Sequence, residues 1–293
     1  MTQAPRITQE MIDLYDEYTH LTLDRRRFMS KLTGLAGSAA AAAAIAPLIA
    51  SNYAQAAIVA PDDPRLAISE VTYPGGAGDV KGYLVMPAER SGALPGVVVI
   101  HENRGLNPHI KDVARRMALE GFVVLAVDLL SRQGGTPASD EEAAKMFQGI
   151  DRAGLVVDAV AAVPYLAGRE ETNGKVGAVG FCFGGGIVNL MAVNSPELAA
   201  AVAYYGSQPP AEDVPKIKAR LMLHYAGLDQ RIGEGIPAYE EALKAAEVDY
   251  QLFIYEGVNH AFNNDTSAAR FDKAAAELAW SRTVSFFKET LAG

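Results

Sequence analysis

Cysteine is almost absent from this sequence, which has one residue of this type, Cys182, among 293. A single cysteine forms no intrachain disulfide, so the count neither supports nor excludes an oxidising compartment. Cys182 has no cysteine neighbour with which to bind a metal, and the five histidines lack metal-ligand spacing. The sequence therefore predicts no metal site and leaves a free thiol to be explained.

Positive charge is also scarce, since 26 Lys and Arg residues stand against 35 Asp and Glu residues, a net charge of -9. No run of basic residues occurs outside the N-terminal region, which argues against a nucleic-acid surface. The stretch GFCFGGG, residues 180–186, lacks the lysine and the spacing of a phosphate-binding loop. We therefore expect a small-molecule substrate, no nucleic-acid partner and no cofactor.

Residues 1–56 differ from the rest of the sequence. DRRRFM, residues 24–29, matches the twin-arginine export pattern, an Ala-rich apolar run follows at 32–50, and Ala54 and Ala56 fit an A-x-A cleavage site. We expect the twin-arginine machinery to export the chain to the periplasm or outside the cell, leaving a mature domain of residues 57–293. Two alternatives stay open. In the first, the apolar run is an uncleaved membrane anchor. In the second, MIDLYDEYTHL, residues 11–21, forms a helix that is retained in the cytoplasm and packs on the domain.

The remainder has no long linker or repeat, which favours one domain. Apolar strands are expected at 80–86 (as an edge strand), 96–101, 122–128, 175–180, 200–206, 219–227 and 250–257. Helical periodicity predicts helices at 109–120, 151–166, from 185 onward, 237–246 and 269–290. Continuous apolar strands that alternate with helices imply an α/β fold with a mostly parallel sheet covered by helices on both faces.

Chemically capable residues follow the ends of these strands. In a parallel sheet, ligands bind beyond the carboxyl ends of the strands. The residues at those ends are His101, Glu102, Asn103, Arg104, Asp128, Arg132, Cys182, Tyr205, Asp229 and His260. The sequence therefore predicts a single site at one edge of the sheet.

The stretch from Gly180 to Gly184 has the G-x-S-x-G spacing of a nucleophile elbow, with cysteine in place of serine. A strand that turns sharply into a helix strains its central residue, and flanking glycines let neighbouring chain pass closely. The helix N-terminus favours a thiolate, and the N–H group of Phe183 is free to donate to an oxyanion. The alternative is an inert buried cysteine.

Asp229 and His260 follow later strands, which gives the chain order nucleophile, acid, histidine of this hydrolase architecture. We expect His260 to accept the thiol proton and later to activate water, while Asp229 fixes its tautomer. The other histidines are weaker candidates: His224 in mid-strand as a core group, His109 at a helix start, His101 as a support of the oxyanion loop, and His20 in the leader.

HENRGLN, VDLLSRQGG, GKVGAVGFCFGGG, HYAGLD and GVNHAF resemble the dienelactone hydrolase family, and the resemblance extends from about Val71 to the C-terminus. It implies an α/β-hydrolase fold and carboxymethylenebutenolidase activity through a Cys-His-Asp triad, here Cys182, His260 and Asp229. It also implies that Glu102 hydrogen-bonds the resting thiol and that the N–H groups of Asn103 and Phe183 form the oxyanion hole. A salt bridge from Glu102 to Arg104 or Arg132 is the alternative.

The sequence departs from the family where substrate is bound. The family binds a substrate carboxylate with two arginines; Arg132 resembles the first, but Asn264 stands at the second position and lacks the planar fork of a guanidinium. Arg104 is a candidate replacement, and a surface role is its alternative. The leader together with HENRGL and HAFNND resembles a twin-arginine-signalled subgroup.

We expect an anionic small ester or lactone as substrate. The alternatives are a carboxylesterase or thioesterase of another substrate range and a non-catalytic homologue that binds a small molecule.

Overall fold

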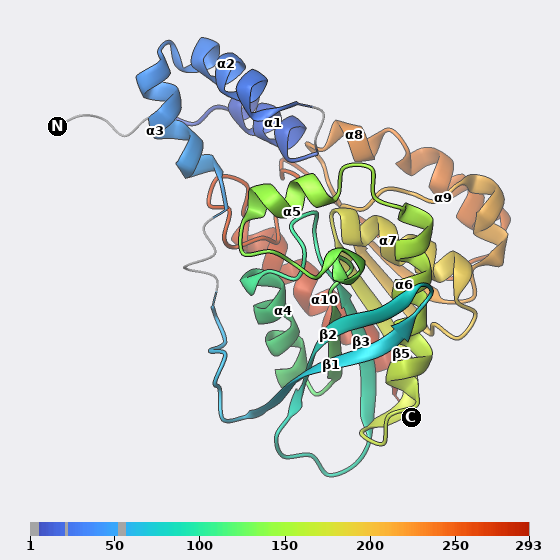
Figure 1. Cartoon of the computed structure of the whole chain (residues 1–293). Helices are drawn as coiled ribbons and strands as arrows, with labels where there is room; N and C mark the ends of the chain where they lie inside the picture. Colours follow the sequence, from blue (N-terminus) through green and yellow to red (C-terminus); the bar gives the residue numbers. More distant parts are fainter. Residues whose placement is uncertain (1–5, 21–22, 52–56, 293) are drawn as a thin grey trace.

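The computed structural model describes residues 6–20, 23–51 and 57–292 (Figure 1). The predicted cleavage site at Ala54 and Ala56 lies outside the described residues. An eight-stranded sheet has the order β1-β2-β4-β3-β5-β6-β7-β8. Its strands are β1 (Leu66–Gly75), β2 (Gly78–Pro87), β3 (Leu94–Ile100), β4 (Val123–Val127), β5 (Thr172–Phe181), β6 (Ala200–Tyr204), β7 (Arg220–Ala226) and β8 (Tyr250–Tyr255).

The predicted α/β fold with a mostly parallel sheet is confirmed. The strands from β4 to β8 across the sheet pair in parallel, whereas β2 pairs antiparallel with both β1 and β4. The prediction of an edge strand at 80–86 is wrong, because β2 lies between β1 and β4. The edge strand on this side is β1, and β8 is the edge strand on the other side. Only Leu66 and Tyr73 of β1 are buried, so it lacks the continuous apolar run that marks the inner strands.

Helices cover both faces of the sheet. Helices α4 (Pro108–Leu119) and α10 (Lys273–Leu291) pack on one face, and α6 (Arg152–Ala167), α7 (Phe183–Asn194) and α9 (Ile236–Ala245) pack on the other. Successive residues of a strand point to opposite faces, so Val97 and Val99 join one core while Val98 and Ile100 join the other. The carboxyl ends of the parallel strands are thereby fixed at one edge.

Short helical segments occur in the loops between the longer elements. They are the 3-10 helices η2 (Ser131–Gln133) and η3 (Ala211–Lys216) and the helices α5 (Asp140–Met146) and α8 (Gln230–Gly233). Figure 1 shows α5 and α8 next to the blue N-terminal segment, at the top of the domain.

The N-terminal segment folds into three helices, α1 (Gln9–Thr19), α2 (Arg25–Ala36) and α3 (Ala39–Ile49), which pack on the domain (Figure 1). They share a small apolar core in which Leu32 and Ile49 are fully buried, and Ala269 of the domain packs against it. Asp24 and Ser38 cap the N-termini of α2 and α3. Whether residues 1–56 are removed or retained stays a prediction.

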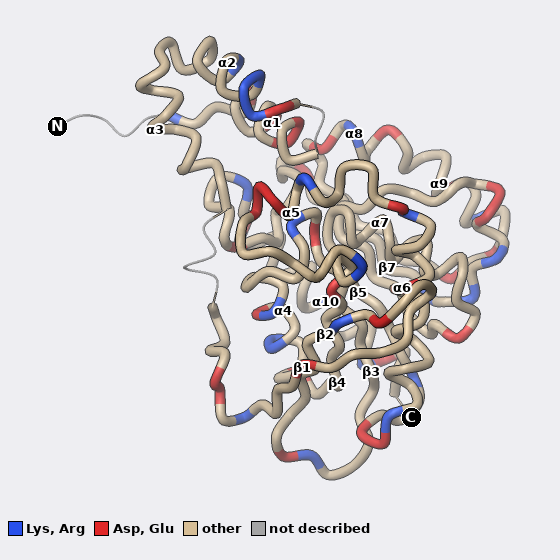
Figure 2. The backbone as a smooth tube through the Cα atoms, viewed as in Figure 1, with Lys and Arg blue, Asp and Glu red and all other residues tan. Residues whose placement is uncertain are grey.

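No single helix in the described ranges is long and apolar enough to span a membrane. Helices α2 and α3 reach the required length and hydropathy only as a pair, and they are bent by 111°. In Figure 2 the basic and acidic residues are interspersed around the domain.

Candidate active site

Cys182 stands on a strained turn between β5 and α7, with φ 55° and ψ -115°. Such a conformation is rare for a residue with a side chain and persists only where the surroundings enforce it. Two glycines permit it: a Cβ on Gly180 would lie 2.1 Å from the carbonyl oxygen of Gly184, and one on Gly184 would lie 2.4 Å from that of Ile100. The elbow predicted from the sequence therefore presents the half-buried thiol at the N-terminus of α7.

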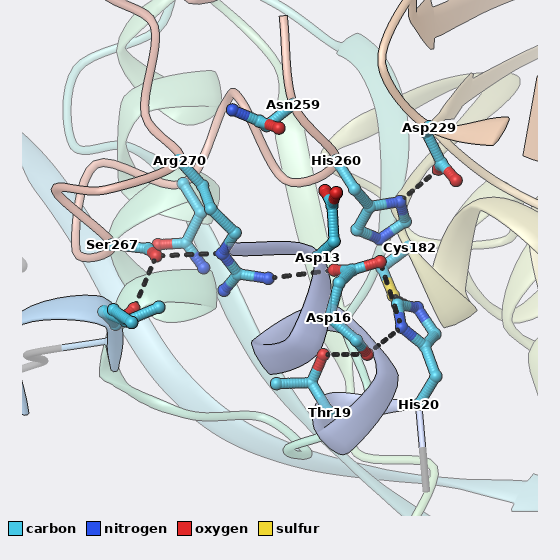
Figure 3. A network of polar contacts seen from close by, with 12 residues as sticks. Asp13, Asp16, Thr19, His20, Cys182, Asp229, Asn259, His260, Ser267 and Arg270 are labelled. Atoms are coloured by element: carbon cyan, nitrogen blue, oxygen red, sulfur yellow. Dashed lines mark hydrogen bonds and ion pairs between the residues drawn. The ribbon is translucent and has the colours of Figure 1, made fainter. Parts of the chain in front are cut away.

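His260 and Asp229 lie beside this elbow. Nδ1 of His260 donates to Oδ2 of Asp229 at 2.5 Å, and the other carboxylate oxygen accepts from the backbone N–H of Ile232 at 3.2 Å. The His260 ring presents a nitrogen within 4.8 Å of the Cys182 sulfur (Figure 3). Its Nε2 atom is buried and makes no hydrogen bond to any described residue. Asp229 thus fixes the tautomer that leaves Nε2 free for proton transfer.

A cavity of about 250 Å³ opens in front of the thiol. It is lined by His20, Asn103, Phe147, Ile150, Arg152, Cys182, Phe183, Tyr205, Ser207, Arg231 and Ile232. Phe183 is the first residue of α7, where backbone N–H groups have no acceptor within the helix. The structure therefore brings both predicted oxyanion-hole residues, Asn103 and Phe183, to the cavity that holds the sulfur.

Charges around the site favour an ion pair between the thiolate and an imidazolium. Burial raises the pKa of the Cys182 thiol, but His260 and His20 outweigh it and lower that pKa from its ordinary 9.0 to about 6. Burial lowers the pKa of His260, whereas Asp16 and Cys182 raise it, together with the hydrogen bond to Asp229, well above its ordinary value. Burial raises the pKa of Asp229, but the hydrogen bond and charge of His260 lower it on balance, so Asp229 stays ionised.

The C-terminal end of α1 lies directly over the nucleophile (Figure 3). His20 Nε2 is 3.5 Å from the Cys182 sulfur, and the backbone oxygen of Thr19 accepts from the side chain of Asn103 at 2.5 Å. The assignment of His20 to the leader does not predict this contact. The available signal was the i, i+4 spacing of Asp16 and His20 in a helical pattern, which places both side chains on one face.

Glu102 and Asn264 bind each other. The Asn264 side chain donates to Oε2 of the buried Glu102 at 2.8 Å, and its own oxygen accepts from the hydroxyl of Thr266 at 2.6 Å. The hydrogen-bond partner of the Glu102 carboxylate is therefore the amide of Asn264, whereas the thiol of Cys182 or the guanidinium of Arg104 or Arg132 was expected. Asn264 orients this carboxylate, and its role toward a substrate stays a prediction.

Arg132 is engaged away from the cavity. Its guanidinium makes a bidentate ion pair with the buried Asp158, at 2.6 and 2.7 Å, and donates to the carbonyl oxygen of Gly154. Arg104 donates to the backbone and side-chain oxygens of Asn103. Neither arginine lines the cavity of about 250 Å³, which contains Arg152 and Arg231 instead.

The remaining histidines occupy structural positions. His224 is fully buried and contacts the hydroxyls of Tyr255 and Thr283 at 3.0 and 3.2 Å, as expected for a core group. His101 donates to the backbone oxygen of Glu102 and accepts from the backbone N–H of Leu129, which supports the loop after β3. His109 pairs with Asp265 at 3.1 Å.

Two groups of described residues place three possible metal ligands within 4.8 Å of one another: His20, Cys182 and His260, and Asp16, Asp229 and His260. In the first group, Nε2 of His20 lies 2.8 Å from Arg231 Nη2 and 3.5 Å from the Cys182 sulfur. In the second group, Asp229 and His260 already bind each other.

An elbow at the carboxyl edge of a mostly parallel sheet defines an α/β-hydrolase. Residues 80–291 match the model of the "Dienelactone hydrolase family". The chain belongs to this family, which confirms the resemblance found in the sequence. Residues 1–37 match a second model, described as "YqhI-like".

Curated relatives and solved structures agree with this assignment. The chain is 30% identical to a protein of Escherichia coli O157:H7 named "Putative carboxymethylenebutenolidase", over 82% of this chain and 93% of that one. A protein of the same name from Methylorubrum extorquens is 30% identical over 94% of this chain and 97% of its own. Among solved structures, a dienelactone hydrolase-like promiscuous phosphotriesterase from metagenomic libraries has 29% identity and a TM-score of 0.71, and the match covers 78% of this chain and 100% of that one.

Proposed function

We propose that this protein hydrolyses small carboxylic esters or lactones, with Cys182 as nucleophile, His260 as acid and base, and Asp229 as the group that orients His260. The observation that carries the proposal is the strained elbow that exposes Cys182 beside a buried His260 bound to Asp229. Membership of the dienelactone hydrolase family supports the same reaction class.

In the first half of the reaction, the Cys182 thiolate attacks the carbonyl carbon of the substrate. The carbonyl electron pair moves to oxygen, and the backbone N–H groups of Asn103 and Phe183 stabilise the resulting oxyanion. As the carbonyl re-forms, the bond to the leaving alkoxide breaks, and this oxygen takes a proton from Nε2 of His260. The products are an alcohol and an acyl-thioester on Cys182. When the substrate is a lactone, the alcohol and the thioester are the two ends of one molecule.

In the second half, water attacks the thioester. Nε2 of His260 accepts a proton from the water, the carbon–sulfur bond breaks, and the electron pair returns to sulfur as the thiolate. The thiolate and the imidazolium are again paired, which agrees with the lowered pKa of Cys182 and the raised pKa of His260.

The charge of the cavity supports an anionic substrate. Arg152 and Arg231 both line it with the thiol, whereas Arg132 is bound to Asp158 and Asn264 is bound to Glu102. We therefore propose Arg152 and Arg231 as the groups that attract a substrate carboxylate. Because both side chains are exposed, salt screens their attraction.

Steady-state hydrolysis by the full chain tests the proposal. A dienelactone and a neutral aryl ester are compared, with Cys182→Ala as the blank. We expect turnover that depends on Cys182, and we expect Arg152→Gln and Arg231→Gln to raise KM for the dienelactone more than for the neutral ester. Arg65→Gln is the matched control, because Arg65 is exposed and pairs with Asp63.

Turnover of the neutral ester alone would keep the mechanism and contradict the anionic substrate. Absence of Cys182-dependent turnover with either ester would refute the proposed reaction and favour a non-catalytic binding protein.

A further inference from the structure

The N-terminal segment contributes a second histidine to the nucleophile. His20 Nε2 is the atom that the structure places in hydrogen-bond contact with the Cys182 sulfur, at 3.5 Å. The rings of His20 and His260 meet edge to face, with centroids 4.8 Å apart, so the thiol lies between two imidazoles (Figure 3). A ring nitrogen of His260 lies within 4.8 Å of the same sulfur.

The tautomer of His20 suits it to accept a proton. Its Nδ1 lies 2.7 Å from the backbone oxygen of Asp16, which can only accept, so Nδ1 carries the hydrogen and Nε2 presents a lone pair. Arg231 Nη2 lies 2.8 Å from the same Nε2, so the single lone pair of this atom serves either the guanidinium or the thiol proton. The Asp16 carboxylate lies 3.4 Å from Nδ1.

Contacts with the domain fix the position of α1. Gln9, at its first turn, donates to the side chain of Asn259 at 2.5 Å, and Asn103 donates to the backbone oxygen of Thr19 at its last turn. Between them, Arg270 Nη1 contacts Asp16 Oδ1 at 3.4 Å. Arg270 is buried, and its guanidinium also lies over the ring of Tyr15, 5.0 Å from the centroid. These contacts hold His20 at the thiol from both ends of the helix.

We propose that His20 is a catalytic residue that shares with His260 the task of accepting the Cys182 proton, so that the N-terminal segment is part of the active enzyme. The inference rests on the proposed function of Cys182. In this step the S–H bond breaks, the electron pair stays on sulfur, and the proton forms a bond to Nε2 of His20. The resulting imidazolium then faces the thiolate on one side and Asp16 on the other.

The proposal separates the roles of the two histidines. The leaving group takes its proton from whichever histidine has accepted the Cys182 proton, and His260, oriented by Asp229, is still required to activate water. His20 changes the fraction of Cys182 present as thiolate. Cleavage at the predicted A-x-A site would remove His20, so the processed chain of residues 57–293 would lack this acceptor.

Several charged groups act on the thiol, and a test of pH dependence must keep them unchanged. They come from every element around it: Asp16 from α1, Glu102 and Arg104 from the loop after β3, Asp140 from α5, Arg152 from α6, Asp229 from the turn after β7, Arg231 from α8, and His260 and Arg270 from the segment after β8. Substitution of His20 alone leaves all nine in place.

The experiment measures the rate of Cys182 alkylation by iodoacetamide against pH in the full-length protein, together with kcat and KM. We expect His20→Ala to raise the midpoint of the alkylation profile by on the order of one pH unit and to lower kcat/KM about tenfold at pH 7, with little change in KM. Added imidazole should restore part of the lost rate in His20→Ala. Lys31→Ala is the matched control, because it removes an exposed ion pair to Glu17 within the same segment and leaves the site intact.

An alkylation profile and kcat/KM in His20→Ala equal to those of the wild type would overturn the role of His20 while leaving the Cys182 mechanism standing. Equal losses in His20→Ala and Lys31→Ala, without rescue by imidazole, would also overturn it, since they would indicate a structural role. Hydrolysis that persists in Cys182→Ala would instead refute the proposed function.

Discussion

The His260→Gln variant tests how the fold activates Cys182. Burial alone raises the pKa of this thiol, and His260 is the strongest of the neighbours that bring it down to about 6 from an ordinary 9.0. A thiol of pKa about 6 is roughly nine-tenths thiolate at pH 7, whereas one of pKa 9 is about one-hundredth thiolate. Glutamine keeps a polar side chain of similar reach but carries no positive charge.

We expect the midpoint of Cys182 alkylation in His260→Gln to rise by at least about one pH unit and ester hydrolysis to be lost. The assay is the rate of iodoacetamide labelling between pH 5 and 10, with the labelled peptide identified by mass. His109→Gln is the control, since His109 is a buried histidine that pairs with Asp265. A midpoint that stays near 6 in His260→Gln, or one near 9 in the wild type, would refute this account of the thiol.

Three further predictions concern the framework of the site. Arg132→Ala should lower the free energy of unfolding by about 2 kcal/mol in urea titrations, because the buried Asp158 loses its cation. KM should stay unchanged. A raised KM at unchanged stability would instead make Arg132 a substrate ligand. Burial holds the pKa of His224 at about 3, below its ordinary 6.5. The free energy of unfolding should therefore fall by about 1.4 kcal/mol for each pH unit between pH 6.5 and pH 3, because the unfolded chain binds a proton that the folded chain does not. His224→Gln should remove this contribution to the slope, and equal slopes in the variant and the wild type would contradict the assignment. Gly184→Ala should abolish activity or folding, since its Cβ would lie 2.4 Å from a backbone oxygen, whereas Gly92→Ala, with nothing within 4 Å, should be neutral in both assays.

The parts of the site that could be predicted from sequence are those with a local signature. The glycines around Cys182 mark the elbow because close backbone approach forbids a side chain at Gly180 and Gly184. Asp229 and His260 were identified because each follows a strand of the parallel sheet. Both features depend on the neighbouring residues along the chain or on the order of elements.

The parts that could not be predicted depend on pairs distant in the chain. Arg132 was expected to bind substrate, but the packing of α6 brings Asp158 to it. Glu102 was expected at the thiol, but Asn264, 162 positions away, binds its carboxylate. His20 was set aside because the composition around it suggested an export signal, and only the docking of α1 on the domain shows its contact with Cys182.

The most direct test of the central claim is to trap the acyl-enzyme. The full-length protein is mixed with an aryl ester, quenched in acid within the first turnover, digested and analysed by mass spectrometry. We expect the acyl group on the peptide that contains Cys182, and we expect it to disappear in Cys182→Ala. An acyl group on another residue, or unchanged hydrolysis by Cys182→Ala, would contradict it.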